Sequence, residues 1–293
     1  MSPAPFAFEA LEAALPEYEI RDVPLGQGAD KIAYKANKDA RDVVVKVLTE
    51  PMPEDLDSLD TLELPDRIGR ELAGMSNVQS PHVVSLLEKP SIARLGNRSY
   101  LWYVEPYYPG GTLEEAIEKS QAGARLGQTV LAAMLRAIDD MWNQARIVHR
   151  DIKPGNIVLD NDQNPILLDL GIAFHSELTE LTDAMGVSPR TPRYAAPEQF
   201  ELRRLATIDF RTDLFLTGLV AYEAYTGRHP YFEVGIDTAT YLNRLASGAP
   251  GVDDLLRAGC SERHARLVVR LLAGRPSGRF RTVALARRMA GEG

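Results

Sequence analysis

The sequence predicts an α+β fold in which strands dominate the first third of the chain and helices dominate the rest. Residues 42–48 and 99–104 are rich in β-branched and aromatic side chains, a composition typical of strands. Further along, Thr112 is a good helix N-cap followed closely by two glutamates, and residues 127–144 are rich in Leu, Ala and Met. The order of these segments, strands first and helices afterwards, is the basis of the prediction.

The composition limits what kind of protein this is. The chain has 293 residues, a net charge of −8 and one cysteine, Cys260, which excludes an intrachain disulfide framework and fits a reducing compartment. No apolar run approaches the ~20 residues that span a bilayer, and residues 1–10 lack the layout of a secretory signal. We therefore expect a cytoplasmic protein without membrane insertion. The acidic balance argues against nucleic acid as the main partner.

Two segments of the strand-rich part carry residues that are suited to contact phosphate. Gly26 and Gly28 predict a tight turn, and glycines let backbone N–H groups approach phosphate oxygens, although for a G-x-G pair alone an ordinary turn is the favoured interpretation. Lys46 lies in the β-branched run 42–48, where by itself it indicates only the edge or end of a strand. Residues 6–15 have apolar positions at helical spacing, and we assign residues 1–16 as an N-terminal extension without a function.

The most informative stretch is 149–156, which reads H-R-D-I-K-P-G-N. Two short apolar runs follow, 157–159 and 166–168, and the Asp/Asn/Pro-containing turn between them predicts a hairpin. A hairpin brings its two ends together, so Asp151, Asn156 and Asp169 should lie in one small volume. Clustered acids repel each other, and a cation with oxygen ligands, most plausibly Mg²⁺, would neutralise them.

H-R-D-x-K-P-x-N followed by D-x-G resembles the catalytic loop and metal-binding segment of eukaryotic-type (Hanks-type) Ser/Thr protein kinases. Later segments agree in order: 194–199 resembles the A-P-E segment, 211–218 the D-x-x-S-x-G helix start, and 275–279 the C-terminal R-P segment. The match runs from about residue 25 to 280, and its style looks bacterial. It implies a bilobal kinase-like fold at 17–286, with a small β-rich N-lobe (17–104), a hinge (105–111) and a larger helical C-lobe (112–286), before a tail at 287–293.

The resemblance also implies roles for the polar residues. Asp151 would accept or orient the proton of an attacking hydroxyl, and Lys153 would stabilise the transferring γ-phosphoryl group of ATP. Asn156 and Asp169 would bind Mg²⁺, with Mn²⁺ as an alternative. Lys46 would hold the α- and β-phosphates.

For the nucleotide, the resemblance implies that Glu71 pairs with Lys46. The backbone of Glu105 and Tyr107 would bond the adenine edge, and Val104 would guard the back of the pocket. ATP would lie in the cleft between the lobes. The sequence departs from the glycine-loop pattern because Lys31 occupies the third glycine position. The expected ATP-binding set is Leu25, Gly26, Gly28, Ala33, Val44, Lys46, Glu71, Val104, Glu105, Tyr107 and Val158.

Three further expectations concern structure and regulation. Glu198 and Arg279 would form a buried ion pair, and Asp213 would be a structural residue. Arg150 would pair with a phosphate on the loop between Asp169 and Glu198, as in kinases regulated by autophosphorylation. The candidate phosphorylation sites are Thr182, Thr179 and Ser188.

The implied function is an ATP-dependent Ser/Thr protein kinase acting on a protein hydroxyl. Lys153-Pro154 after the catalytic Asp favours Ser/Thr over Tyr specificity. A pseudokinase or nucleotide-binding scaffold is the alternative, supported only by the missing third glycine. A small-molecule phosphotransferase is disfavoured because that class lacks the block at 196–198.

Overall fold

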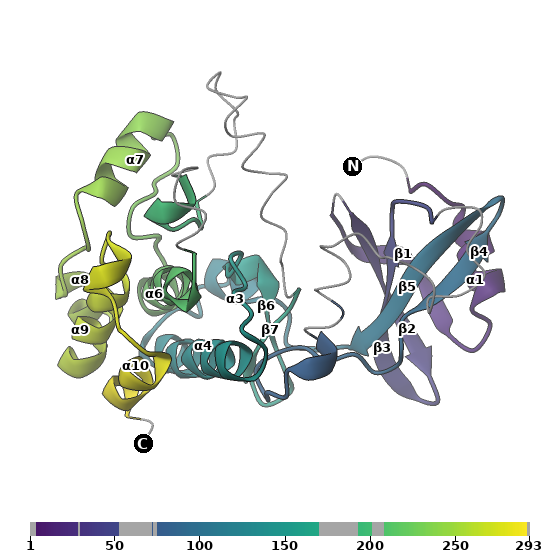
Figure 1. The fold of residues 1–293 in the computed structure, drawn as a ribbon, viewed down its shortest axis with the longest axis horizontal. Helices are drawn as coiled ribbons and strands as arrows, with labels where there is room; N and C mark the ends of the chain where they lie inside the picture. The colour runs from purple at the N-terminus through teal and green to yellow at the C-terminus, as the bar shows by residue number, and fades with distance from the viewer. Residues whose placement is uncertain are drawn as a thin grey trace. The chain divides into compact units, whose positions relative to one another are not determined.

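The computed structural model describes residues 4–28, 30–52, 72, 75–169, 193–200 and 208–291. The chain divides into two compact units. Unit 1 consists of residues 1–76 and 84–107, and unit 2 consists of residues 77–83 and 108–293. The strands of the large sheet lie in unit 1 and the longer helices in unit 2, so the predicted α+β class is confirmed (Figure 1).

Unit 1 is built on a five-stranded antiparallel sheet with strand order β1-β2-β3-β5-β4. Directly paired residues of antiparallel strands point to the same face, and successive residues alternate between faces. One face is apolar and buried: Ile32, Val45 and Val104 all belong to a single hydrophobic cluster on it. The strands are β1 (Glu19–Gln27), β2 (Lys31–Lys38), β3 (Arg41–Leu48), β4 (Ser91–Leu95) and β5 (Arg98–Pro106).

The N-terminal segment packs on this apolar face. Helix α1 (Phe8–Ala14) places Leu11 fully buried in the cluster, and the ring of Phe6 meets the ring of Tyr100 edge-on at 5.2 Å between centroids. The side chain of Tyr18 packs edge-on against Trp102 in the same way. The helical spacing seen in residues 6–15 therefore corresponds to a packing helix, and its buried residues belong to the core of unit 1.

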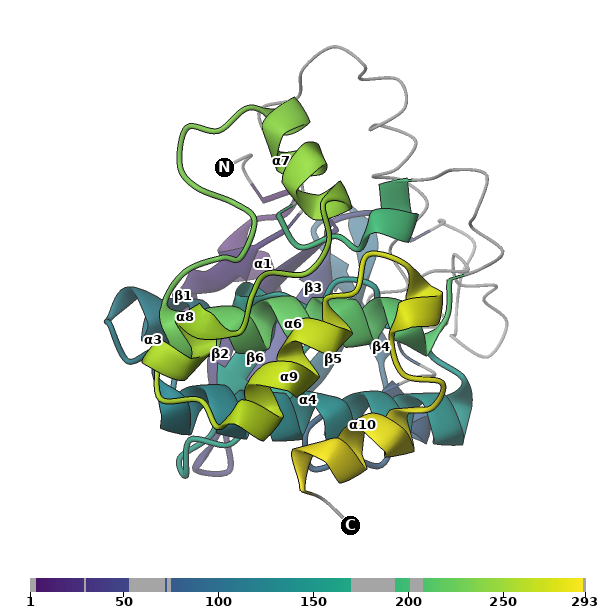
Figure 2. The same ribbon diagram turned by 90° about the vertical axis from the view of Figure 1, so that its left-hand side faces the viewer.

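Unit 2 is organised around two long helices, α4 (Ala124–Ala145) and α6 (Phe210–Thr226), which run side by side (Figure 2). Most residues of α6 are buried, whereas α4 buries one face, so α6 is the central helix of the unit. The other helices are α3 (Leu113–Glu118), α7 (Thr238–Ala246), α8 (Asp253–Arg257), α9 (Glu262–Leu271) and α10 (Val283–Ala290).

The shorter elements of unit 2 carry the predicted hairpin. Strands β6 (Ile157–Leu159) and β7 (Pro165–Leu167) pair antiparallel, with Val158 opposite Ile166, and a 3₁₀ turn at Pro154–Asn156 precedes them. Thr112 caps α3 as predicted, since its Oγ1 accepts a hydrogen bond from the Glu115 N–H. Two further 3₁₀ turns lie at Pro197–Phe200 and Pro276–Gly278.

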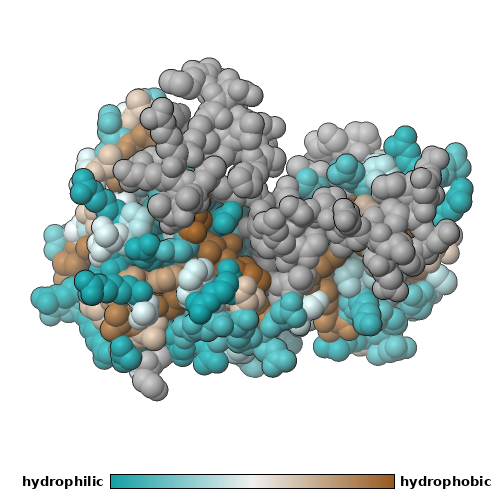
Figure 3. All heavy atoms as spheres, in the orientation of Figure 1, coloured by the Kyte–Doolittle hydropathy of each residue, from teal (hydrophilic) through white to brown (hydrophobic). Residues whose placement is uncertain are grey.

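The surface of the described residues is mainly hydrophilic in the view of Figure 3, with apolar side chains showing in smaller areas. Among these residues, no helix is long and apolar enough to cross a membrane.

Candidate active site

The polar residues of the 149–156 stretch form one hydrogen-bonded group in unit 2. The ammonium of Lys153 lies 2.8 and 3.1 Å from the two carboxylate oxygens of Asp151. The side-chain N–H₂ of Asn156 donates to the same carboxylate at 2.8 Å and to the Asp151 backbone carbonyl at 2.9 Å. The Asp151 carboxylate is therefore fixed by two neighbours, and its side chain remains partly exposed, as a group that must meet a substrate requires.

The loop that carries Asp151 is anchored to helix α6 by Asp213. This carboxylate is fully buried and accepts hydrogen bonds from two backbone N–H groups, that of His149 at 2.7 Å and that of Arg150 at 2.8 Å. Burial raises the pKa of Asp213 to about 6, while the two N–H groups oppose the increase. Arg150 takes a positive φ of 68° beside this carboxylate. The structural role expected for Asp213 is thus visible in its contacts.

His149 connects the loop to the hairpin. Its Nε2–H donates to the Leu168 carbonyl at 2.9 Å, and its Nδ1 accepts from the Asp151 N–H at 3.3 Å. The Leu168 N–H in turn donates to the Asn156 carbonyl at 2.8 Å. Asp169, the next residue, has a positive φ of 49°. The hairpin therefore brings Asp169 to the group formed by Asp151 and Asn156, as the sequence predicted.

The residues gathered here fit a divalent cation such as Mg²⁺. Asn156 uses its amide nitrogen for both bonds to Asp151, which leaves the amide oxygen as a ligand atom. Asp169 adds a carboxylate, and amide and carboxylate oxygens are the ligands that hard cations prefer. The short backbone bond between Leu168 and Asn156 keeps both donors together before any metal binds.

In unit 1, the expected phosphate-contacting lysine lies on the sheet face opposite the apolar cluster. Ala33 pairs directly with Lys46, so both side chains lie on this face, and Val44 shares it two residues away on β3. The turn before β2 is closed by a hydrogen bond from the Gly28 N–H to the Lys31 carbonyl at 2.9 Å. Leu25, on β1, is 52% exposed.

Lys46 is buried, and its described partner is Glu105. The ammonium lies 3.0 Å from Oε1 and 2.8 Å from Oε2 of this glutamate, and the two side chains are only 6% and 2% exposed. The partner predicted from the family resemblance is Glu71, which lies outside the described residues. The Glu105 side chain is not part of that prediction, although a glutamate at the end of the apolar run 101–104 is an unusual feature of the sequence.

The expected position of Val104 at the back of a nucleotide pocket is wrong. Val104 pairs with Val45, and both belong to the apolar cluster on the face away from Lys46. Because side chains alternate along a strand, the neighbouring Glu105 is the residue on the Lys46 face.

The backbone groups expected to bond adenine are used within the sheet, for a related reason. The Val104 carbonyl accepts from the Leu87 N–H, at the edge of β5 away from β3. Backbone groups alternate between edges in an antiparallel ladder, so Glu105 faces Val44 on β3, and the Tyr107 N–H donates to the Asp42 carbonyl at 3.4 Å. The backbone groups of Glu105 and Tyr107 therefore belong to the sheet.

The expected ion pair between Glu198 and Arg279 is present in unit 2. The guanidinium donates to the two carboxylate oxygens at 2.6 and 2.9 Å. Nearby, Tyr194 donates a 2.5 Å hydrogen bond to Glu223. Burial raises the pKa of Glu223. The candidate phosphorylation sites Thr179, Thr182 and Ser188 lie outside the described residues.

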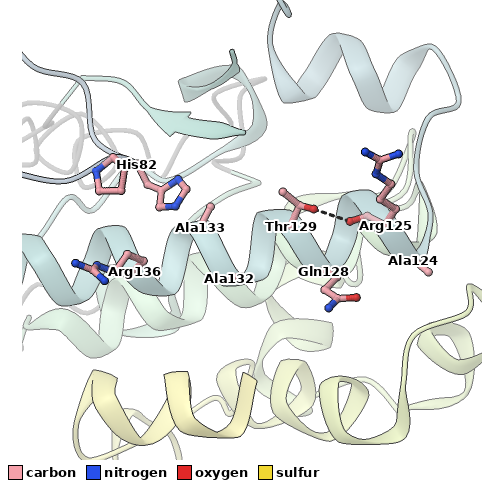
Figure 4. Close-up of a pocket in the computed structure, with 9 residues that line it drawn as sticks. His82, Ala124, Arg125, Gln128, Thr129, Ala132, Ala133 and Arg136 are labelled. Atoms are coloured by element: carbon pink, nitrogen blue, oxygen red, sulfur yellow. Dashed lines mark hydrogen bonds between the residues drawn. The ribbon is translucent and has the colours of Figure 1, made fainter. Parts of the chain in front are cut away.

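A separate groove of about 700 Å³ runs along α4 in unit 2 (Figure 4). None of its lining residues belongs to the predicted site, and none carries a carboxylate. Thr129 within it donates to the Arg125 carbonyl of its own helix. The lining residues are Pro81, His82, Ala124, Arg125, Gln128, Thr129, Ala132, Ala133 and Arg136.

A family model described as the protein kinase domain matches residues 20–287, which is most of the chain. The chain belongs to the protein kinase family. The predicted resemblance to Hanks-type Ser/Thr kinases of bacterial style is confirmed, because bacterial Ser/Thr kinases are among the relatives of this kinase domain.

One relative is the DNA damage-responsive serine/threonine-protein kinase RqkA of Deinococcus radiodurans, 30% identical over 256 residues. The match covers 86% of this chain and 36% of that protein. Another is the probable serine/threonine-protein kinase PknB of Bifidobacterium longum, 33% identical over 172 residues, covering 56% of this chain and 24% of PknB. The kinase domain thus spans roughly a third or less of these relatives.

A solved structure of Rad53, in complex with AMP-PNP, resembles the chain with a TM-score of 0.69 and 23% identity. The match covers 94% of this chain and 66% of that one. At this identity the likeness supports the fold.

Proposed function

We propose that this kinase domain is an active, ATP-dependent serine/threonine protein kinase that transfers the γ-phosphoryl group of Mg·ATP to a protein hydroxyl. The observation that carries the proposal is the group formed by Asp151, Lys153 and Asn156, in which a carboxylate, a cation and an amide are hydrogen-bonded to one another. Phosphoryl transfer needs positioning and charge stabilisation more than covalent chemistry, and these three side chains supply both.

Asp151 is the residue that accepts or orients the proton of the acceptor hydroxyl. Its carboxylate is held from two sides and stays partly exposed, so it is fixed in direction and accessible to a substrate. Lys153, bonded to the same carboxylate, places a positive charge where negative charge develops on the transferring group.

Asn156 and Asp169 are the metal ligands of this proposal. A bound Mg²⁺ disperses the negative charge of the phosphates. Mn²⁺ would be accepted by the same oxygen ligands.

On unit 1, Lys46 holds the α- and β-phosphates, and Ala33 and Val44 on the same face contact the base. Leu25, Gly26 and Gly28 are further proposed ATP-binding residues of unit 1, and Val158 is one of unit 2. For the adenine edge we assign the Pro106 carbonyl instead of Glu105 and Tyr107. Pro106 is two residues beyond Val104 and therefore directs its carbonyl to the same edge of β5, away from β3.

A protein substrate is favoured by the contacts of the segment 193–200. Glu198 in this segment pairs with Arg279, and the Gln199 side chain donates to the Arg150 carbonyl on the catalytic loop at 3.0 Å. This segment is therefore coupled to the loop that carries Asp151. Arg150 would also pair with a phosphate added by autophosphorylation at Thr182, or otherwise at Thr179 or Ser188.

The test is transfer of label from γ-labelled ATP to a generic basic protein in the presence of Mg²⁺, with Asp151→Asn as the matched variant. We expect transfer by the wild type and at least a hundredfold loss in the variant, with nucleotide binding retained. Equal turnover by both proteins would contradict the role of Asp151.

The alternative function is a pseudokinase that binds nucleotide without transferring phosphate. It is favoured by Lys31, which stands in place of the third loop glycine and whose ammonium lies 3.3 Å from the Tyr103 hydroxyl. Nucleotide binding without transfer by the wild type would support this alternative.

A further inference from the structure

We propose that Glu105 is a positioning residue for Lys46, and that its carboxylate holds the ammonium in place to meet the nucleotide phosphates. This inference rests on the proposed function. Its starting point is the buried ion pair, in which the ammonium of Lys46 lies 2.8 and 3.0 Å from the two oxygens of Glu105. The resemblance to kinases assigns such a partner to a helix, whereas this carboxylate comes from the sheet itself.

The register of the sheet sets the geometry of the pair. Val44 lies opposite Glu105, and Lys46 lies opposite Tyr103. Glu105 is therefore the diagonal neighbour of Lys46 on the same face, within reach of a long side chain. Strands β3 and β5 are both interior strands of the five-stranded sheet, paired on each side. The positions of both Cα atoms are thus fixed by backbone hydrogen bonds, without dependence on a loop or on a helix that must dock.

Burial indicates that the charge of Glu105 matters more than its packing. Both side chains are almost completely inaccessible, and removing an ionised pair from water is costly unless the two charges neutralise each other. An apolar side chain of similar size would fill this position without that cost. A carboxylate is useful here because it orients the ammonium of Lys46, which holds the α- and β-phosphates in the proposed function.

The pair is compatible with phosphate binding. A lysine ammonium has three N–H donors, so it can contact a carboxylate and a phosphate oxygen at the same time. A phosphate oxygen can then share the ammonium with the carboxylate. Loss of the Glu105 carboxylate should therefore leave the Lys46 ammonium charged but less firmly oriented. The main effect should be a lower kcat/KM for ATP.

The test compares Glu105→Gln, which keeps the size and removes the charge, with Glu105→Asp, which keeps the charge. Tyr100→Phe is the matched control, because it alters a buried side chain on the same strand but on the opposite, apolar face. We expect Glu105→Gln to lower kcat/KM for ATP at least tenfold, with little change in KM for the protein substrate. Glu105→Asp should recover a large part of the loss, and Tyr100→Phe should stay within twofold of the wild type.

A second measurement separates positioning from stability. The dissociation constant for ATP is measured in a double-mutant cycle with Lys46→Met. If Glu105 acts through Lys46, its substitution weakens binding in the wild-type background and has no effect when Lys46 is absent. The double variant, Glu105→Gln with Lys46→Met, has no buried charge left without a partner at this pair. We therefore expect it to fold even if Glu105→Gln alone does not.

The outcomes distinguish this inference from the proposed function. An active wild type with a Glu105→Gln variant within twofold of it in kcat/KM and ATP affinity would overturn the role of Glu105 and leave the kinase activity standing. A wild type that binds ATP without turnover would overturn the kinase activity, and the binding cycle would still decide the role of Glu105. A wild type that neither binds nor uses ATP would overturn both.

Discussion

Arg279 and Glu198, 81 positions apart, form a bidentate ion pair, and less than 2% of either side chain is exposed. The same guanidinium also donates to the backbone carbonyls of Ala273 and Arg211. The Glu198 carboxylate also accepts from the Thr212 hydroxyl at 2.9 Å. The pair thus connects the 196–199 segment, the start of α6 and the turn before α10, and it fixes the platform on which we expect the protein substrate to bind.

Glu198→Gln should therefore destabilise the protein strongly. The change leaves a guanidinium buried without its counter-charge, a loss of about 3–5 kcal/mol in the free energy of unfolding. Equilibrium unfolding in urea measures this difference. Glu262→Gln is the matched control, since it breaks an exposed pair with Arg266 on α9, and it should leave the midpoint unchanged. Equal midpoints for both variants would contradict the structural role of Glu198.

Lys153 provides a test of charge stabilisation in the catalytic group. Its ammonium contacts both oxygens of Asp151 and is partly exposed. Lys153→Ala should lower kcat about 10–1,000-fold with little change in KM for ATP, because the lost interaction acts mainly in the transition state. Steady-state kinetics measures both constants. Lys119→Ala, which removes an exposed pair with Glu115, is the control and should have no effect. A matching loss in both variants would rule out a specific role for Lys153.

The catalytic loop was predictable from the sequence because it is contiguous. Within the stretch 149–156, local spacing alone places Asp151, Lys153 and Asn156 together, and the hairpin that follows has clear turn residues before Asp169. The long-range pair of Glu198 and Arg279 could be named only because the family resemblance supplied it.

The predictions that the structure corrects concern the end of strand β5, where the pairing register decides which face and which edge each residue takes. Assigning a strand to residues 99–104 is possible from composition, but which face each residue takes depends on its pairing with β3 and β4. A shift of one residue exchanges Val104 for Glu105 beside Lys46. The same shift moves the backbone groups of Tyr107 from the open edge to Asp42. A pattern of residue types cannot resolve a displacement of that size.

Metal dependence tests the roles of Asn156 and Asp169. Removal of divalent cations with a chelator should abolish phosphoryl transfer, and added Mg²⁺ should restore it. Asn156→Ala removes one of the two proposed ligands, so we expect it to raise the Mg²⁺ concentration for half-maximal activity about tenfold or more. A titration of activity with Mg²⁺ at fixed ATP measures this value. Asn164→Ala, in the turn between β6 and β7, is the control and should leave the Mg²⁺ requirement unchanged.

His229 makes stability depend on pH. Its Nε2–H donates to the Arg193 carbonyl, and its Nδ1 accepts from the N–H groups of Tyr231 and Phe232. Burial lowers the pKa of His229 to about 4, from 6.5. Between these values the unfolded chain therefore binds a proton at His229 that the folded chain does not, and this residue alone lowers the free energy of unfolding by about 1.4 kcal/mol for each pH unit of acidification.

His229→Gln keeps one donor and one acceptor but does not titrate. We expect the stability advantage of the wild type over this variant to shrink steadily as the pH falls from 6.5 to 4. Urea unfolding of both proteins across this range measures the difference. Asp213, whose raised pKa of about 6 acts in the opposite direction, is present in both proteins and cancels. A constant difference between pH 4 and 7 would contradict a neutral, partly buried His229.

Gly127 tests the contact between the two central helices of unit 2. It lies in the first turns of α4, and a Cβ atom added there would overlap the aromatic ring of Tyr225 on α6. Gly127→Ala should therefore lower the free energy of unfolding by about 1–3 kcal/mol, despite the better helix propensity of alanine, since a well-packed core does not accept the added methyl without displacement. Thermal unfolding measures the change. At Gly251 an added Cβ meets no atom within 4 Å, so Gly251→Ala should leave the melting temperature close to that of the wild type. If Gly127→Ala were as stable as Gly251→Ala, the close approach of α4 and α6 at this position would be refuted.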